Sequence, residues 1–302
     1  MTLHCYLQCG LGDFYDLFTI LPDFIKQNNV DKVKFWVDSV YFHNGGLVKQ
    51  KQSVIDLIDS VSGDYTVIPQ ECGSYNKLYY KNFEVDRWAG PIYEDIKNTF
   101  MPLRKPLTQS YMRSRIKYDD LFIHAIMGIN FTYQWVDSCN VPLIDYVRKP
   151  VELELTHEEE FRCFQILQDH DTILQVRRKG KGETDEYFKD IHRMLSAVGS
   201  IKGKLPLVID FDGVHIPDAK EYDLSFAEVL HLVARVENMI TSSSVLGCHR
   251  LHYNKTTIIN TPYRNGSNEI IFKDYLSNPN YLFLDAEKDN LTRILGEIAT
   301  WL

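Results

Sequence analysis

Asp13 is the first residue of this sequence whose type and position suggest chemistry, because it follows a Gly10-Leu11-Gly12 turn. The apolar run Leu3–Cys9 before the turn predicts a short buried strand, and helical spacing of apolar residues predicts a helix over Phe14–Lys26. Gly12 lets backbone approach a ligand closely, as at the start of nucleotide-binding folds. An acid at this helix start opposes a phosphate, so Asp13 suits removal of a proton from a hydroxyl. The alternative is that Asp13 only caps the helix.

Two segments of the second half carry groups that bind phosphate. Arg177-Arg178-Lys179-Gly180-Lys181-Gly182 follows the strand predicted over Thr172–Val176, and Ser242-Ser243-Ser244 follows the strand predicted over Met239–Thr241. The cations would neutralise a leaving diphosphate, while hydroxyls and backbone N–H groups at a helix start would donate hydrogen bonds to it. Ligands of such sheets bind at strand carboxyl ends, so together the segments predict a donor site. The alternatives are a solvated basic turn and a serine cap.

A basic and aromatic stretch over Phe100–Tyr118 predicts a surface for a polyanion on this acidic protein. Trp88 is a further candidate, because it could stack on an extruded base if the polyanion is nucleic acid. The other candidate is a phosphorylated glycolipid, and the alternative to both is a basic loop that balances local acids. The predicted acceptor residues of this stretch are Arg104, Lys105, Arg113, Arg115 and Lys117.

Composition narrows the class of protein. The chain has 302 residues, 44% of them hydrophobic and 13% aromatic, which is enough for packed cores. Its formal net charge of −8 argues against a protein whose whole surface coats nucleic acid, although a local basic groove is compatible with it. We see no signal peptide and no apolar segment near the roughly twenty residues that span a bilayer. The 6 scattered cysteines form no C-x-x-C pair, which predicts reduced thiols in a cytoplasmic compartment.

No metal site is predicted. His249 and His252 are three residues apart with no further ligands close in sequence. The acid pair Asp210 and Asp212 follows a predicted strand, where it also suits contacts to ribose hydroxyls, and we assign Asp212 to the donor site.

Alternation of strands and helices predicts the α/β class with parallel sheets covered on both faces. Two halves of similar size join near residue 150, so we predict domains over 1–150 and 151–302. Thr156 and Glu159 form a capping box at the start of the first helix of the second half. Residues 71–118 show no clean period, which indicates a loop-rich insertion that carries recognition, and Asn290–Leu302 predicts a closing amphipathic helix.

Three segments give the chain a resemblance to GT-B glycosyltransferases, specifically to the ADP-heptose–lipopolysaccharide heptosyltransferase family. They are Gly10–Asp13 with the helix after it, the basic loop over Gln175–Gly182, and the block Leu224–Asn260, which includes His249 on a helix. The resemblance implies two Rossmann-like domains facing across a cleft, with the C-terminal helix packing back toward the first. It also implies a metal-independent transfer from a nucleotide-diphosphate sugar, with His249 on the donor side. Where that family has Asp-Thr-Gly or Asp-Ser-Gly before a helix, this chain has Ser242-Ser243-Ser244, which we call the serine turn. The resemblance therefore does not imply that the transferred sugar is heptose.

The residues and the resemblance together predict an inverting glycosyltransferase. The donor binds the second domain and requires no cofactor. The acceptor, a polyanionic glycan of lipopolysaccharide type, binds the first domain and loses its proton to Asp13. A phage enzyme that glycosylates a hydroxylated DNA base is the alternative, and the expected location is the cytoplasm of a bacterium or of a phage host. Two other classes stay open: a nicotinamide-dependent oxidoreductase, for which the turn lacks the third glycine, and a binding module without activity.

Overall fold

The structure of the chain is a computed structural model, and it divides into two compact units that we describe separately. The first unit comprises Met1–Val151 with Asn265–Ile271, and the second comprises Glu152–Arg264 with Phe272–Leu302. The described residues are 1–7, 11–38, 48–68, 115–117, 120–125, 132–134, 146–175, 195–201, 203–209, 220, 222–242, 245–260, 277–284, 296 and 299–301.

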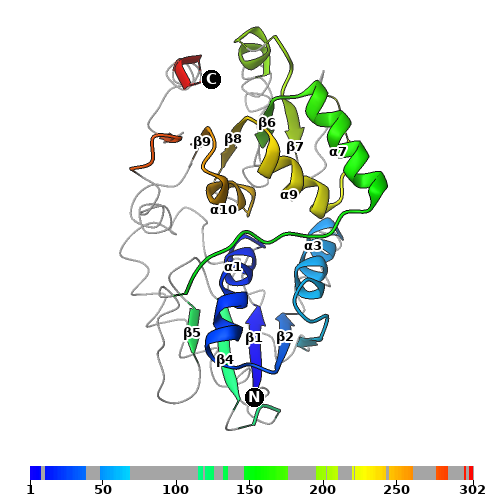
Figure 1. Cartoon of the computed structure of the whole chain (residues 1–302), viewed down its shortest axis with the longest axis vertical. Coiled ribbons are helices and arrows are strands. Elements are labelled where there is room, and N and C mark those ends of the chain that lie inside the picture. Colours follow the sequence, from blue (N-terminus) through cyan, green and yellow to red (C-terminus); the bar gives the residue numbers. More distant parts are fainter. Residues whose placement is uncertain are drawn as a thin grey trace, which may run out of the picture. The chain divides into compact units, whose positions relative to one another are not determined.

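The first unit contains a five-stranded sheet with the order β3-β2-β1-β4-β5 (Figure 1). β1, β2, β3 and β4 run parallel, whereas β5 pairs antiparallel with β4. This is the strand order of a Rossmann fold, whose order reverses between β1 and β4. Its elements are β1 (Thr2–Leu7), α1 (Leu11–Gln27), β2 (Lys32–Asp38), α3 (Val48–Asp59), β3 (Tyr65–Ile68), β4 (Leu121–Ala125) and β5 (Thr132–Gln134).

Burial in the first unit is centred on β1 and α1. Leu3 to Leu7 are all buried, which is typical of a central parallel strand covered on both faces. On α1, Phe18 stacks on Phe35 of β2 with ring centroids 5.1 Å apart. Tyr15 and Thr19 are also buried, so apolar and polar faces of this helix are both covered. The sheet covers one face, and a segment after β5, described below, covers the other.

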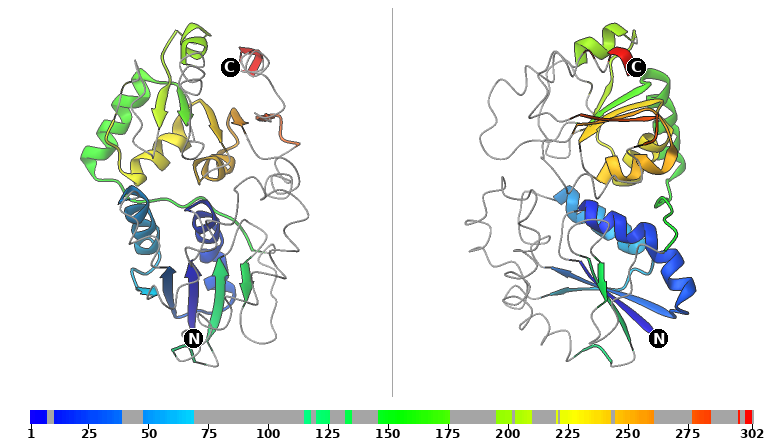
Figure 2. Two further views of the ribbon diagram at one scale, coloured as in Figure 1. Left: turned by 180° about the vertical axis from the view of Figure 1, so that it is seen from behind. Right: turned by 90° about the vertical axis from the view of Figure 1, so that its left-hand side faces the viewer.

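The second unit contains a five-stranded sheet with the order β10-β9-β8-β6-β7, in which every strand pair is parallel (Figure 2). Numbered within the unit, this is the order 2-1-3-4-5 of flavodoxin-like sheets, which reverses between β6 and β8. The two units therefore share the α/β class and differ in strand order. The elements are α7 (His157–Asp169), β6 (Thr172–Gln175), β7 (Leu207–Ile209), α9 (Phe226–Arg235), β8 (Asn238–Ser242), α10 (Val245–Arg250), η4 (Leu251–Tyr253), β9 (Thr257–Asn260) and β10 (Tyr281–Leu284).

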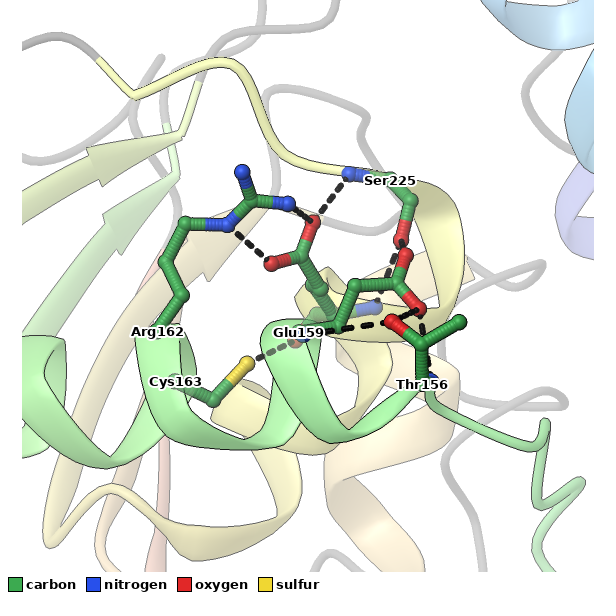
Figure 3. Close-up of polar contacts among 6 residues, drawn as sticks. Thr156, Glu159, Arg162, Cys163 and Ser225 are labelled. Atoms are coloured by element: carbon green, nitrogen blue, oxygen red, sulfur yellow. Dashed lines mark hydrogen bonds and ion pairs between the residues drawn. The ribbon is translucent and has the colours of Figure 1, made fainter.

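Two helices of the second unit are joined at their N-termini by interlocked capping boxes (Figure 3). Thr156 and Glu159 form the predicted box of α7, and Ser225 and Glu228 form a second box on α9. The Ser225 hydroxyl also donates to Glu159 at 2.8 Å, and Arg162 donates two hydrogen bonds to Glu228 at 2.6 and 2.8 Å. Each acidic residue thus caps its own helix and binds a residue of the other.

The expected α/β class with two Rossmann-like units is confirmed, and the predicted strands are present with ends shifted by a few residues. One helix differs in a way that matters: α1 begins at Leu11, so Gly12 and Asp13 lie inside its first turn rather than in a turn before it. The antiparallel strand β5 was not predicted. Most of 71–118 and of the expected closing helix Asn290–Leu302 lies outside the described residues. None of the helices in the described part is both long and apolar enough to cross a membrane.

Candidate functional site

The carboxyl ends of β6 and β8 lie side by side at the point where the strand order of the second sheet reverses. The parallel register pairs Ile173 with Met239 and Leu174 with Ile240. At this edge the buried Thr241 hydroxyl donates to the Gln175 side-chain oxygen at 2.5 Å. This hydrogen bond joins the carboxyl ends of the two strands. Ligands of open α/β sheets bind at this position. The pairing therefore makes this edge the candidate ligand site of the second unit.

The predicted donor segments leave from this edge. The basic loop with Arg177, Arg178, Lys179 and Lys181 begins directly after β6, and Ser242 ends β8. Asp212 follows β7, which pairs with β6 on its other side. The structure does not describe the basic loop, Asp212, Ser243 or Ser244. The site is therefore defined by the ends of the strands that precede these residues.

Arg250 anchors the helix that follows the serine turn. Its side chain is fully buried, and the pKa of its guanidinium falls to about 10 because burial disfavours the charge. All five of its hydrogen bonds end on oxygens at the end of α9 and the start of β9, so the cation closes the carbonyl end of α9. These acceptors are Val233 O, Val236 O, Glu237 O, Thr256 O and Thr257 Oγ1, at 2.7–3.1 Å. α10 is therefore fixed, and with it the position of Val245, the first residue after the three serines.

His249 has a structural environment. Its ring is 1% exposed, and Nε2 donates to the Leu230 carbonyl at 2.9 Å while the ring packs edge-on against Tyr253. Burial lowers the pKa of this imidazole to about 3, so it is neutral at physiological pH. This geometry does not support the predicted donor contact of His249, and we do not carry that contact into the proposed site.

The N-terminus of α1 lies at the carboxyl edge of the first sheet, next to the reversal between β1 and β4. Only residues 8–10 separate it from the end of β1. Asp13 is the third residue of this helix, whereas an N-cap residue precedes the first helical one. The capping alternative is therefore wrong in its N-cap form, although an acid in the first turn still interacts favourably with the helix dipole. The side chains of Gly12 and Asp13 lie outside the described part.

An irregular segment over 146–151, which we call the strap, runs antiparallel along α1. Near the end of α1, Tyr146 packs on Phe24 with ring centroids 5.0 Å apart. One turn after the start of α1, the Val151 amide donates to the Tyr15 hydroxyl at 3.1 Å. Between these points, the backbone of the strap donates to Asp23 Oδ2 at 2.8 Å and to Thr19 O at 2.9 Å. The strap thus buries the face of α1 that the sheet leaves uncovered.

Arg148 of the strap forms an ion pair with Asp16, whose side chain is 10% exposed. Asp16 lies one turn after Asp13 and is the next carboxylate of the helix. Because its Oδ1 already accepts from a guanidinium, Asp16 serves to hold the strap. Asp13 stays the carboxylate that the sequence predicts as the base.

Arg115 and Lys117 are the two predicted acceptor residues within the described part, and both are exposed. They precede β4, which runs parallel to β1, and Asp120 just after them accepts from the Thr2 amide at 2.9 Å. They therefore lie at the amino edge of the sheet, about 15–20 Å along the strands from the edge that carries Asp13. A contact of these two residues with the acceptor would therefore lie away from the reacting hydroxyl. Trp88, Arg104, Lys105 and Arg113 lie outside the described residues.

Among the described residues, no group of three or more His, Cys, Asp or Glu side chains could hold a metal ion. The described cysteines Cys5, Cys163 and Cys248 are free thiols. Burial raises the pKa of the Cys163 thiol to about 12, so this sulfur is an unreactive core group.

The structure is similar over its whole length to solved structures of proteins that handle nucleotide sugars. The Methanocaldococcus jannaschii UDP-GlcNAc 2-epimerase, in complex with UDP-GlcNAc and UDP, matches with a TM-score of 0.52 and 12% identity over 100% of this chain and 93% of that one. E. coli heptosyltransferase WaaC with ADP matches with a TM-score of 0.48 and 10% identity over 99% and 98%. E. coli ADP-heptose LPS heptosyltransferase II matches with a TM-score of 0.48 and 12% identity over 100% and 98%. No protein-family profile and no curated protein sequence matches the chain.

The likeness to the epimerase shows the fold: two successive Rossmann-like units of the GT-B class. Sequence reasoning missed three features that position the site. The strap has no periodic pattern of apolar residues that would predict it. Arg250 has no sequence signal that distinguishes it from a surface cation. The second capping box did have a signal, because Ser225 and Glu228 have the Ser-x-x-Glu spacing.

Proposed function

We propose that this protein is an inverting glycosyltransferase that takes its sugar from a nucleotide-diphosphate donor. The observation that carries the proposal is the pairing of β6 with β8 at the strand-order reversal of the second sheet. Because the two strand ends are neighbours, the segment with four cations and the segment with three serine hydroxyls begin side by side. Cations and a dense set of N–H and O–H donors are what a diphosphate requires.

The reaction needs no resident metal on this proposal. Arg177, Arg178, Lys179 and Lys181 offset the charge that develops on the leaving diphosphate. The serine turn binds the same phosphates, and Asp212 binds ribose hydroxyls. The GT-B class of the fold, which the UDP-sugar-bound epimerase also has, supports a donor of this type.

Asp13 acts as the general base in the proposed mechanism. The acceptor hydroxyl oxygen attacks the anomeric carbon from the face opposite the diphosphate, and its proton passes to the Asp13 carboxylate. The bond between the anomeric carbon and the phosphate oxygen breaks, and the nucleoside diphosphate leaves with that electron pair. Attack from the opposite face inverts the configuration at the anomeric carbon.

The acceptor is proposed to be an extended polyanion, either a phosphorylated glycan of lipopolysaccharide type or DNA with a hydroxylated base. Arg115 and Lys117 lie at the amino edge of the first sheet, far from Asp13. An acceptor that uses both regions must extend over the length of the strands, which a polymer does and a single sugar does not. Binding at Arg115 and Lys117 would then add affinity without touching the reacting group.

A nucleotide screen tests the donor site. Thermal unfolding is measured with UDP, GDP, ADP and CMP, because a ligand that binds only the native state raises Tm. Arg178→Ala and Lys181→Ala should weaken binding of the stabilising diphosphate about tenfold or more, and binding of its nucleoside much less. Lys26→Ala, which removes an exposed lysine from the end of α1, is the matched control. Equal losses for diphosphate and nucleoside, or no shift with any nucleotide, would contradict the donor site and favour a binding module without activity.

Turnover tests the proposed base. Asp13→Asn keeps the side-chain size and should lower transfer about 10²–10⁴-fold, with donor affinity and Tm nearly unchanged. Asp59→Asn, at the exposed end of α3, is the control carboxylate. NMR of the product sugar reports the anomeric configuration. Retention of configuration, or epimerisation of the donor sugar without transfer, would refute the mechanism.

Salt dependence tests the acceptor surface. Arg115→Glu with Lys117→Glu should weaken acceptor binding and lower the slope of log affinity against log salt by about one per lost phosphate contact. Donor affinity should stay at the wild-type value. An unchanged slope would show that both residues are solvated surface cations that do not bind the acceptor.

A further inference from the structure

We infer that α7 is a self-association surface through which two copies of this chain form a symmetric dimer. The inference is independent of the proposed function, since α7 lies at the outer border of the second unit (Figures 1 and 2). Phe161 and Phe164 are 63% and 59% exposed, although the other face of the same helix carries the buried Cys163 and Ile166. Residues three apart lie on one helix face, so the two rings form one continuous apolar patch.

Two exposed residues from another segment lie near the C-terminal end of α7. Lys204 donates to the Gln168 carbonyl at 3.1 Å, and the Leu205 carbonyl is 2.7 Å from His170 Nδ1, so both residues lie at the C-terminal end of α7. Leu205 is 53% exposed, so it presents a further apolar side chain at this end. Lys204 is exposed as well. Asp169, the last residue of α7, is paired with Lys220 at 3.4 Å, so the charge of Lys204, which has no ion pair among the described residues, makes this end positive.

The opposite end of α7 is acidic, because Glu158 is exposed in its first turn. The surface is therefore negative at one end, apolar in the middle and positive at the other. Two antiparallel copies match this pattern with itself: Glu158 of each copy faces Lys204 of the other. A two-fold axis makes both contacts at once, and the helix dipoles then oppose each other favourably.

The position of the aromatic residues fits the same symmetry. α7 spans 157–169, so positions 161 and 164 lie on either side of its midpoint. In an antiparallel pair with full overlap, Phe161 of each copy packs on Phe164 of the other, and offset or edge-on aromatic pairs of this kind add to the apolar burial. An anionic membrane is a poorer occupant, because the first turn carries Glu158, Glu159 and Glu160.

Sedimentation velocity of the full chain from about 5 to about 500 µM tests the dimer, because a contact built on one helix predicts association that depends on concentration. The wild-type mass should approach twice the chain mass at the highest concentration. Phe161→Gln with Phe164→Gln should give a monomer throughout. A mass of one chain at every concentration, or dimers that survive this double substitution, would overturn the inference.

A charge exchange tests the register. Lys204→Glu and Glu158→Lys should each weaken the dimer at least tenfold, and the two together in one chain should restore it. Within one copy these residues lie at opposite ends of a 13-residue helix, so only a contact between copies can produce the rescue. Lys26→Glu is the control for net charge, and Tm verifies that each variant is folded. Additive losses without rescue would overturn the antiparallel register.

Discussion

Replacement of Glu228 by glutamine should destabilise the second unit by about 2–4 kcal/mol. The Glu228 side chain is fully buried and accepts three hydrogen bonds, two from Arg162 at 2.6 and 2.8 Å and one from the Ser225 amide at 2.7 Å. Glutamine keeps the shape, but its NH₂ group must face at least one of these donors. A hydrogen bond to a charged group contributes about 1.5–3 kcal/mol, and the facing donors add a desolvation cost. Arg162 is 42% exposed, so water offsets part of its loss and sets the upper limit.

Urea unfolding measures this loss, and hydrogen exchange of the first turns of α7 and α9 assigns it to the second unit. Glu154→Gln, at an exposed position just before α7, is the matched control and should change stability by less than about 0.5 kcal/mol. A double-mutant cycle with Arg162→Met should give a coupling of about 1–3 kcal/mol. A loss below about 1 kcal/mol for Glu228→Gln, or no coupling to Arg162, would refute the interlocked caps as a source of stability.

Three further variants test the elements around the site. The pKa of His249 falls from 6.5 to about 3, so between these pH values the unfolded state binds a proton that the native state does not bind. The free energy of unfolding should therefore fall by about 1.4 kcal/mol per pH unit below pH 6.5. His249→Gln should remove that part of the slope in urea titrations between about pH 6.5 and pH 5. Arg250→Lys cannot reach all five oxygens and should cost about 2–4 kcal/mol in urea unfolding; a loss below about 1 kcal/mol would contradict its anchoring role. Arg148→Met should speed hydrogen exchange in the first half of α1 about tenfold or more, and added Asp16→Asn should recover part of the loss; unchanged exchange would exclude the strap as a clamp.

The sequence predicts those parts of the structure that local patterns determine. The strand β1, the helix after it and the capping box at Thr156 follow from apolar spacing and one short motif. The start of α1 at Leu11 was missed, because the two glycines favour a turn in isolation whereas the packed helix extends through Gly12. Strand order depends on contacts between distant segments, so neither β5 nor the different orders of the two sheets could be predicted.

The candidate site divides in the same way. Residue types predict that two loops bind phosphate, and the parallel pairing of β6 with β8 places the strand ends before these loops side by side. His249 has the same local sequence whether it faces a ligand or a core, and only its burial against Leu230 decides its role. Residues 115–117 precede a strand parallel to β1, so only the pairing of the strands shows that they lie at the edge opposite Asp13.

The strap has a consequence for cutting this protein into independently expressed parts. The segment 146–151 follows β5 of the first sheet, and it contacts α1 from Tyr15 to Phe24. A fragment that stops after β5 would leave Tyr15, Asp16 and Thr19 of α1 facing water, together with the charge that Arg148 balances. A fragment that ends at Val151 retains every one of these contacts, and its complement begins at Glu152, just before the Thr156 cap of α7. A division of the chain between these parts should therefore follow Val151, the last residue of the strap, although the strap has no regular secondary structure.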